Sequence, residues 1–289
     1  MPRKPLLTDA IALISREIPP QKPHISHSQL SMYWRCPEQY RRRYMEGERI
    51  PPGIAMMTGS AVHKGIETNF RRKIETHEDL PAAEIKDAAV AAFSDGLADE
   101  YALTEEEETI GRGIVVGDAI DQVTALAGLH ATDQAPEYQP TEVEHATRIV
   151  FQDAPVDLLA ITDLRDDRHR VTDFKTAARR KPEGEVHSSV QLTIYAAAFW
   201  VDHGTPPMAV HLDTLVKTKT PKRQLLTSTR DMSHIEVLVR RINVTLAAIQ
   251  AGAFTPCPPD AWQCSDRWCG YFRTCPYVNS EPQRKETDA

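Results

Sequence analysis

The chain has 289 residues, 41% hydrophobic and 26% charged, which is enough for one large globular domain or two modest ones and argues against extended disorder. It has no run of about 18 apolar residues, and its N-terminal stretch carries Asp9, Arg16 and Glu17, so we expect neither a membrane span nor a secretory signal. The net charge of −7 argues against a basic coat for nucleic acid but allows a local cationic track.

The first half of the chain is predicted to be helical. An amphipathic helix over residues 6–18 stops at Pro19-Pro20. A second helix opens with Ser26 or Ser28 as its N-cap and carries Cys36 among aromatic residues. Apolar periodicity predicts further helices over 58–73, 81–101 and 104–130.

From Glu142 the pattern changes to strands. Runs over 143–151, 156–165 and 169–175, separated by turn residues, predict a three-stranded meander. A helix over 188–202, strands over 209–216 and 224–228, and a helix over 232–252 follow, and the polar tail after Asn279 is expected to fray. Helices and strands in this order predict an α/β fold.

Two acids and a lysine lie within the meander. Side chains alternate faces along a strand, so Asp173 and Lys175 project to the same side, and Asp163 lies on the neighbouring strand. The carboxylates can hold a divalent ion, while the lysine can orient or deprotonate a water and offset charge on a phosphate. The set predicts a metal-dependent centre that cleaves phosphodiesters, although each acid alone would also suit an exposed strand.

Two further groups of residues can serve such a centre. Gln191 and Tyr195 lie one helical turn apart and can reach the DNA backbone or the lysine, or simply pack on an amphipathic helix. Basic runs that can follow a phosphate backbone, or be solvated surface, include Arg179, Arg180, Lys181, Lys217 and Lys219.

Four of the five cysteines crowd the C-terminus. Disulfides are not expected in the cytoplasm, the predicted location, so these thiols indicate a metal or cluster that organises a stretch poor in aliphatic residues; free buried cysteines are the alternative. The spacing of four and then five residues is looser than in zinc ribbons and favours a four-iron cluster over zinc. Cys257 lies between prolines, farthest from the others in this group, and is left out, so the predicted ligands are Cys36, Cys264, Cys269 and Cys275.

The order of these residues resembles the PD-(D/E)XK nuclease superfamily, in particular RecB-like and CRISPR-adaptation-type exonucleases with an iron–sulfur cluster. The resemblance covers residues 26–277. The motif residues are Ser26, Ser28, Tyr33, Cys36 and Pro37, then Gly59 and His63, then Asp163, Asp173 and Lys175, then Gln191 and Tyr195, then the trailing cysteines. The gap between Cys264 and Cys269 is wider than the two-residue gap of CRISPR-adaptation and AddB-type members.

The resemblance implies a restriction-endonuclease-like core, a mixed sheet flanked by helices, with a helical N-terminal half and a cysteine-rich C-terminal Fe–S segment. Mg²⁺ or Mn²⁺ would be held by His63, Asp163, Asp173 and the Phe174 carbonyl, with Lys175, Gln191 and Tyr195 also catalytic, and a [4Fe–4S] cluster, or Zn²⁺, by the cysteines. The expected divisions are 1–25 (N-terminal helix and linker), 26–280 (nuclease domain, with arm 26–135, core 140–252 and Fe–S segment 253–280) and 281–289 (tail).

The expected function is a DNA exonuclease that processes single-stranded or duplex ends in recombination, repair or phage replication. It would act in the cytoplasm, or in the host cytoplasm if phage-encoded, without a membrane partner; an oligomer is compatible with the helical first half. The alternatives are a non-catalytic single-strand-binding protein and a nuclease-fold subunit of a recombinase or helicase complex. The intact acid–lysine set argues against the former, whereas the lack of a Walker motif leaves the latter open.

Overall fold

The computed structural model describes residues 23–151 and 156–279. Its contacts separate these residues into two compact units: residues 23–24 and 51–239 form the first, and residues 25–50 and 240–279 form the second. The predicted helix over 6–18 and the tail after Asn279 lie outside the described residues. The domain bounds expected from the sequence stay a prediction.

The first unit contains a mixed β-sheet. Its strands are β2 (Pro140–Ile149), β3 (Asp157–Asp166), β4 (Arg170–Ala177), β5 (Ala209–Val216) and β6 (Lys222–Ser228). The pairs β2–β3, β3–β4 and β5–β6 are antiparallel, whereas β4 and β5 pair in parallel. The predicted meander is therefore confirmed, and the parallel pair results from the helical connection between β4 and β5.

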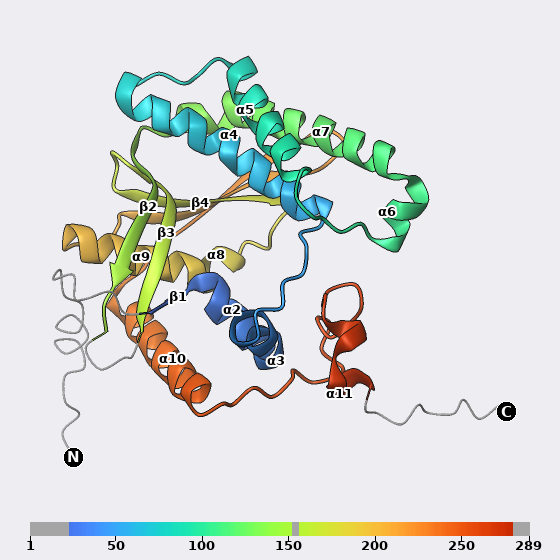
Figure 1. Ribbon diagram of the computed structural model, residues 1–289. Coiled ribbons are helices and arrows are strands. Elements are labelled where there is room, and N and C mark those ends of the chain that lie inside the picture. The colour runs from blue at the N-terminus through green and yellow to red at the C-terminus, as the bar shows by residue number, and fades with distance from the viewer. Residues whose placement is uncertain (1–22, 152–155, 280–289) are drawn as a thin grey trace. The chain divides into compact units, whose positions relative to one another are not determined.

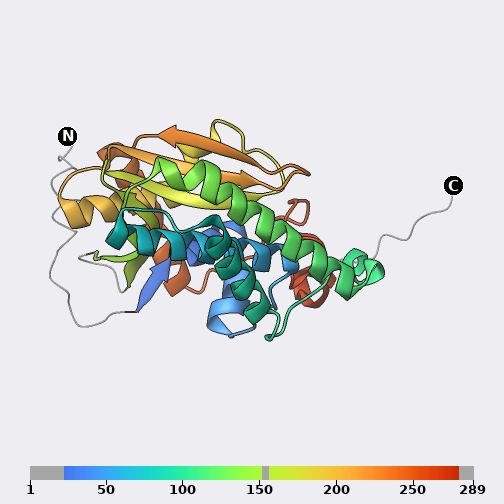
Figure 2. The same cartoon turned by 90° about the horizontal axis from the view of Figure 1, so that it is seen from above.

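Helices flank this sheet, as the fold class predicts. They are α4 (Ile54–Thr76), α5 (Ala82–Gly96), α6 (Glu105–Ile110), α7 (Arg112–Leu129), the short turns η2 (His130–Gln134) and η3 (Ala135–Glu137), α8 (Glu185–Ser188) and α9 (Val190–His203). Helices α4, α5 and α7 lie side by side over one face of the sheet, and α9 lies on the other side (Figures 1 and 2). Phe70, Phe93 and Leu126 from the three helices share a core with Leu164 and Phe174 from the sheet.

One predicted helix, over 104–130, is two helices in the structure. Gly111 ends α6 and precedes α7 with φ of +100°, a conformation that glycine adopts far more readily than other residues. Thr104 caps α6 by accepting the Glu107 amide, and the Glu107 side chain accepts the Thr104 amide in return.

The second unit consists of several short helices and the C-terminal part of one longer helix. It contains α2 (His27–Arg35), α3 (Pro37–Tyr40), the π-helical turn η1 (Arg41–Met45), the end of α10 (Met232–Gln250), η4 (Phe272–Thr274) and α11 (Pro276–Asn279); the short strand β1 (His24–Ser26) lies at the unit boundary. Ser26, one of the two predicted candidates, is the N-cap of α2 and forms a capping box with Gln29. Helix α2 ends at Cys36, where the following proline disfavours a helical backbone. Among the described residues, no helix has the length and apolar character needed to cross a membrane.

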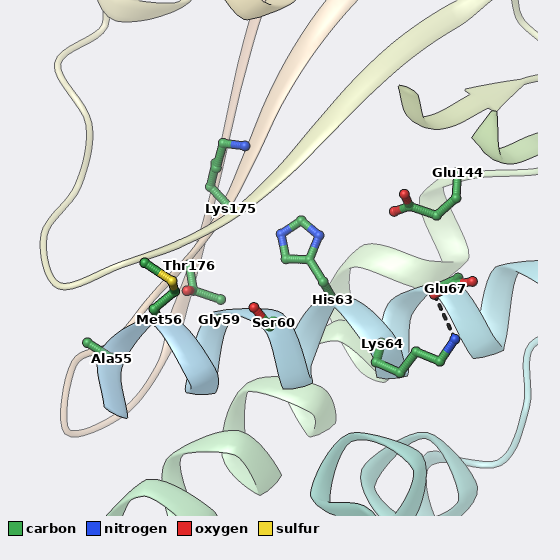
Figure 3. Close-up of a pocket in the computed structure, with 10 residues that line it drawn as sticks. All are labelled: Ala55, Met56, Gly59, Ser60, His63, Lys64, Glu67, Glu144, Lys175 and Thr176. Atoms are coloured by element: carbon green, nitrogen blue, oxygen red, sulfur yellow. Dashed lines mark hydrogen bonds and ion pairs between the residues drawn. The ribbon is translucent and has the colours of Figure 1, made fainter. Parts of the chain in front are cut away.

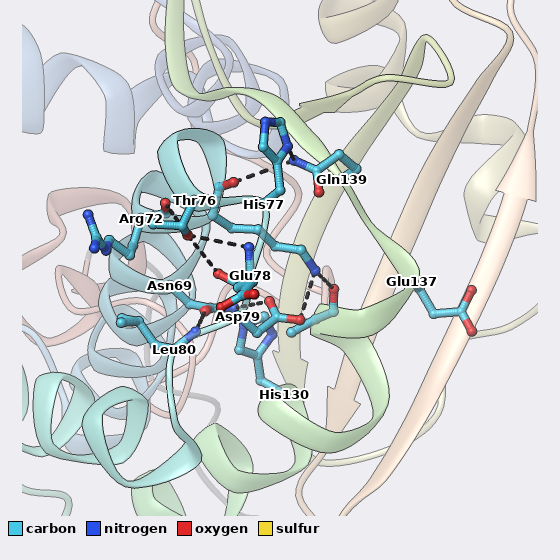
Figure 4. Close-up of polar contacts among 12 residues, drawn as sticks. Asn69, Arg72, Thr76, His77, Glu78, Asp79, Leu80, His130, Glu137 and Gln139 are labelled. Carbon is cyan, nitrogen blue, oxygen red and sulfur yellow. Dashed lines mark hydrogen bonds and ion pairs between the residues drawn. The ribbon is translucent and has the colours of Figure 1, made fainter.

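Polar side chains at the end of α4 lie beside His130 (Figure 4), and buried residues continue this network to the sheet. Asn69 donates to Asp79 at 2.9 Å and also contacts His130 Nε2 at 3.3 Å. His130 Nδ1 lies 3.0 Å from Gln134 Oε1, and Gln134 donates to Asp213 at 2.8 Å. Burial lowers the pKa of His130 to about 4, so the ring is neutral and can accept from Asn69 while donating to Gln134.

Asp213 is the acceptor on which this network converges. It is fully buried on β5 and accepts hydrogen bonds from Gln134, from the Tyr138 hydroxyl at 2.7 Å and from the Arg223 guanidinium at 2.7 and 3.0 Å. The carboxylate therefore holds groups from the η2–η3 turn and from β6 against β5. Removing it would leave the half-buried Arg223 without its ion-pair partner and the buried Tyr138 and Gln134 without their acceptor.

We expect Asp213→Ala to lower the free energy of unfolding by about 3–5 kcal/mol, because breaking a buried ion pair strands the remaining charge. Urea denaturation followed by circular dichroism measures the change. The matched control is Glu75→Ala, which breaks the exposed pair with Arg72 and should cost less than about 1 kcal/mol. Equal losses for the two variants would contradict the assigned role of Asp213.

Candidate active site

Two carboxylates meet where the backbone pairing of β3 and β4 ends. The last paired residues are Leu164 and Thr172, and the same register would next place Asp163 opposite Asp173. At that point Asp163 Oδ2 accepts the backbone N–H of Phe174 at 2.9 Å. A side chain thus replaces the strand ladder there and brings the two acids together.

The two acids are electrostatically costly to place together. Burial, together with the negative charge of Asp163, raises the pKa of Asp173 to about 7, and burial also raises the pKa of Asp163. Lys175 Nζ donates to Asp173 Oδ1 at 2.7 Å, as the alternation along β4 predicts. Burial acts to lower the pKa of Lys175, but the two carboxylates outweigh it and raise the pKa, so Lys175 carries a positive charge.

Helix α4 brings His63 to these acids. A Cβ added at Gly59 would lie 3.2 Å from the Thr176 hydroxyl, so glycine allows α4 to approach β4 closely at this point. One helical turn later, His63 Nδ1 lies 3.8 Å from Asp163 Oδ2. Burial and the charge of Lys175 lower the pKa of His63, which leaves the neutral imidazole that can bind a metal ion.

Helix α9 supplies the other contact to Asp163. Gln191 Nε2 donates to the Tyr195 hydroxyl at 2.9 Å, and the hydroxyl donates to Asp163 Oδ1 at 3.2 Å. Burial and the charge of Asp163 raise the pKa of Tyr195 well above its usual value, so the phenol stays a donor. The two residues thus act on Asp163, whereas the sequence suggested the lysine or the DNA backbone as their targets.

Phe174 contributes to the site through its backbone. Its side chain is buried and stacks on Phe70 with ring centroids 5.7 Å apart, which anchors β4 to the helical core. Its amide binds Asp163, and its backbone also hydrogen-bonds the His63 ring. The buried Phe174 side chain therefore fixes the position of β4, and with it the positions of Asp173 and Lys175.

A cavity of about 550 Å³ opens beside these groups, and Lys175, His63 and Glu144 point toward it (Figure 3). Glu144 has a left-handed backbone, with φ of 50°, and burial together with the charges of Asp163 and Glu67 raises its pKa to about 7. Glu67 is held by Lys64 at 3.0 Å and by Arg71 at 2.7 Å. Both residues are visible in the sequence as possible supports of the site, because Glu67 lies four residues after His63 on the same helix face and Glu144 lies on the first strand of the meander.

The donor chemistry of the site fits a divalent cation. Among the described residues, no three His, Cys, Asp or Glu side chains form a ready-made metal cage. Nevertheless, the buried Asp173, the largely buried Asp163 and a neutral imidazole face one ammonium group, which leaves negative charge that a divalent ion would offset. Carboxylate oxygens are the donors that Mg²⁺ and Mn²⁺ prefer.

The predicted DNA-binding residues lie in the loops that follow the ends of β4 and β5. The paired strands β4 and β5 both end there, and the Lys217 amide donates to the Ala177 carbonyl at 2.7 Å. Lys217 Nζ also contacts the carbonyl of Ala55, which lines the cavity, at 3.4 Å. Lys181 pairs with Glu185 at 2.8 Å, while the side chains of three residues are exposed: Arg179, Arg180 and Lys219.

In the second unit, all five cysteines line one cavity of about 290 Å³ and none forms a disulfide. The Cys257 amide donates to Cys36 Sγ at 3.3 Å, and the Cys257 thiol hydrogen-bonds both Cys36 and Cys264. Cys264 in turn interacts electrostatically with Cys269 and Cys275. The structure thus gathers the four predicted ligands and also Cys257, which the sequence analysis left out.

Comparison with known proteins places this geometry in a family. The model of the PD-(D/E)XK nuclease superfamily matches residues 24–276. A crystal structure of a "putative exonuclease" from Eubacterium rectale has a similar fold, with a TM-score of 0.56, 10% sequence identity, and coverage of 84% of this chain and 87% of that chain. The crystal structure of SSO0001 aligns with a TM-score of only 0.41 at 14% identity, over 94% of this chain and 95% of that chain.

Comparison with curated proteins finds no match. The family match spans most of the chain, and the ordered acid–lysine set lies within it. Proteins of this superfamily generally use divalent metal ions such as Mg²⁺. The chain belongs to the PD-(D/E)XK nuclease superfamily.

Proposed function

We propose that this protein is a Mg²⁺- or Mn²⁺-dependent DNA exonuclease that processes DNA ends in recombination, repair or phage replication. The observation that carries the proposal is the convergence of Asp163, Asp173 and Lys175 at the end of the β3–β4 ladder, beside an open cavity. The fold shared with the Eubacterium rectale protein supports exonuclease action. A cytoplasmic setting and a recombinase or helicase partner fit this role.

The proposed metal ligands are Asp163, Asp173, His63 and the Phe174 carbonyl. When bound, a divalent ion supplies Lewis-acid stabilisation of the charge that develops on the scissile phosphate. Lys175, as an ammonium, would exchange its hydrogen bond to Asp173 for one to an oxygen of the scissile phosphate, where its positive charge offsets the charge that develops there. Tyr195, held by Gln191, keeps Asp163 in a single orientation, and the loops after β4 and β5 supply cations for the DNA backbone.

We further propose that the thiol-lined cavity holds a [4Fe–4S] cluster, with Zn²⁺ as the alternative occupant. Cys36, Cys264, Cys269 and Cys275 are the proposed ligands, which the cavity brings together from distant parts of the sequence. Four thiolates suit either occupant. The role is structural, because the segment from Cys257 to Cys275 is made of turns and short helical pieces with little aliphatic side-chain burial.

We expect Lys175→Ala to lower the rate of Mg²⁺- or Mn²⁺-dependent cleavage of end-labelled linear DNA by about 100-fold or more, because it removes a charge that stabilises the transition state. DNA binding should change by no more than a few fold. The matched control is Lys222→Ala, which removes an exposed lysine from β6 and should cleave normally. Full cleavage by Lys175→Ala would disprove the assignment, and comparing linear with circular substrates tests whether ends are required.

We expect Tyr195→Phe to raise the Mg²⁺ concentration needed for half-maximal cleavage by about 10- to 100-fold, because Asp163 loses the donor that orients it. Saturating metal should restore much of the rate. Tyr101→Phe, which removes a hydroxyl from a half-buried tyrosine without a role in the site, is the control. A lower rate at every metal concentration, with unchanged metal dependence, would show that Tyr195 does not act through the metal ligand.

We expect the protein purified without oxygen to contain roughly four iron and four sulfide per chain, and Cys36→Ser to lose them. Cys257→Ser, the control within the same cavity, should retain the iron because four other thiols remain. Metal analysis and the visible absorption spectrum provide the measurement. Stoichiometric zinc in the anaerobic preparation would replace the cluster assignment with a zinc site.

A further inference from the structure

Two tryptophans of the second unit are held in solvent. Trp262 and Trp268 are 69% and 57% exposed, and their rings meet edge to face with centroids 5.6 Å apart. Large apolar rings are seldom left this exposed side by side, because burying such a ring is worth about 2–3 kcal/mol. The pair therefore forms an aromatic platform open to a ligand.

The loop that carries the platform has a defined conformation. In the sequence, Trp262 lies two residues before Cys264, and Trp268 lies directly before Cys269. Two turns form here: the Cys264 amide donates to the Ala261 carbonyl at 2.8 Å, and the Cys269 amide donates to the Ser265 carbonyl at 2.9 Å. The two tryptophans thus alternate along the chain with Cys264 and Cys269, two residues that line the cysteine cavity. A metal or cluster bound by these cysteines would therefore also restrain the loop that carries the tryptophans.

The charge of the second unit matches a polyanion. Residues 25–50 and 240–279 contain nine arginines, no lysine and five acidic residues, a net charge of +4 in a chain whose total is −7. Arg267 lies over the Trp268 ring with its guanidinium carbon 5.4 Å from the centroid. Guanidinium groups both bind phosphates and stack beside aromatic rings, so cation and platform are combined in one place.

We propose that Trp262, Trp268 and Arg267 form a binding platform for single-stranded DNA. Unpaired bases stack on the indole rings, and the arginines contact the phosphates. A duplex offers its bases already stacked on one another, so the platform favours a single strand. This inference rests on the proposed nuclease function for the identity of the polymer and specifies the form of DNA that is bound.

The test measures binding without cleavage. The full-length Lys175→Ala protein, purified without oxygen, is titrated into a fluorescein-labelled oligothymidylate of about 15 nucleotides and, separately, into a blunt duplex of the same length. Fluorescence anisotropy gives the affinity, and quenching of tryptophan emission reports stacking. Trp262→Ala and Trp268→Ala are added singly and together, with Trp262→Phe and Trp268→Phe as conservative replacements.

We expect each alanine substitution to weaken binding of the oligothymidylate by about 5- to 100-fold, each phenylalanine to restore most of the affinity, and duplex affinity to change less. Val244→Ala, which removes another exposed apolar side chain of this unit, should bind normally. Unchanged metal content in the variants shows that the loop is intact. Unchanged affinity of the double alanine variant overturns the proposal; if self-association is lost instead, the tryptophans form a protein interface.

The two proposals fail separately. If the protein with Lys175 intact cleaves no DNA but its tryptophans are needed for single-strand binding, the nuclease proposal fails and the platform stands. If it cleaves DNA and the double alanine variant still binds the oligothymidylate normally, only the platform fails.

Discussion

The candidate site depends on the opposition of two carboxylates, the buried Asp173 and the largely buried Asp163. Each acid raises the cost of ionising the other, as the elevated pKa of Asp173 shows. The surrounding groups reduce that cost. The Lys175 ammonium donates a hydrogen bond to Asp173, and the Phe174 amide and the Tyr195 hydroxyl each donate one to Asp163. A divalent ion would offset the remaining negative charge, so the electrostatic cost of the pair and the proposed chemistry have the same origin.

The fold holds this pair by constraints from both sides of the sheet. Phe174 packs against Phe70 and sets the position of β4, so Asp173 and Lys175 emerge together on the opposite face. Gly59 brings α4 close to β4 at Thr176. Both carboxylate oxygens of Asp163 accept hydrogen bonds, one from the Phe174 amide and one from the Tyr195 hydroxyl, so the side chain has little freedom to rotate away from Asp173. Changes in packing on either face should therefore be felt at the acids.

Local patterns predicted most of this arrangement. Strand alternation placed Asp173 with Lys175, and Ser26 was one of the two predicted N-caps because capping is a local pattern. Contacts that depend on tertiary structure were harder to predict. The spacing of one helical turn shows that Gln191 and Tyr195 are neighbours, but only the packing of α9 shows that the Tyr195 hydroxyl binds Asp163. Cys257 was set aside because of its prolines, yet the fold places it between Cys36 and Cys264. The left-handed backbone of Glu144 carried no local signal, since that conformation usually falls to glycine or asparagine.

Net charge is a poor guide to DNA binding in this protein because its charges are divided between the two units. Only five of the 41 acidic residues fall in residues 25–50 and 240–279, and these ranges contain nine arginines and no lysine. The acids of the first unit include the proposed metal ligands, whose charge a bound ion would offset locally. A polyanion approaching the chain meets a field set by the nearest charges, because salt screens those beyond about 10 Å. A total charge of −7 is thus compatible with a DNA-binding surface on the second unit.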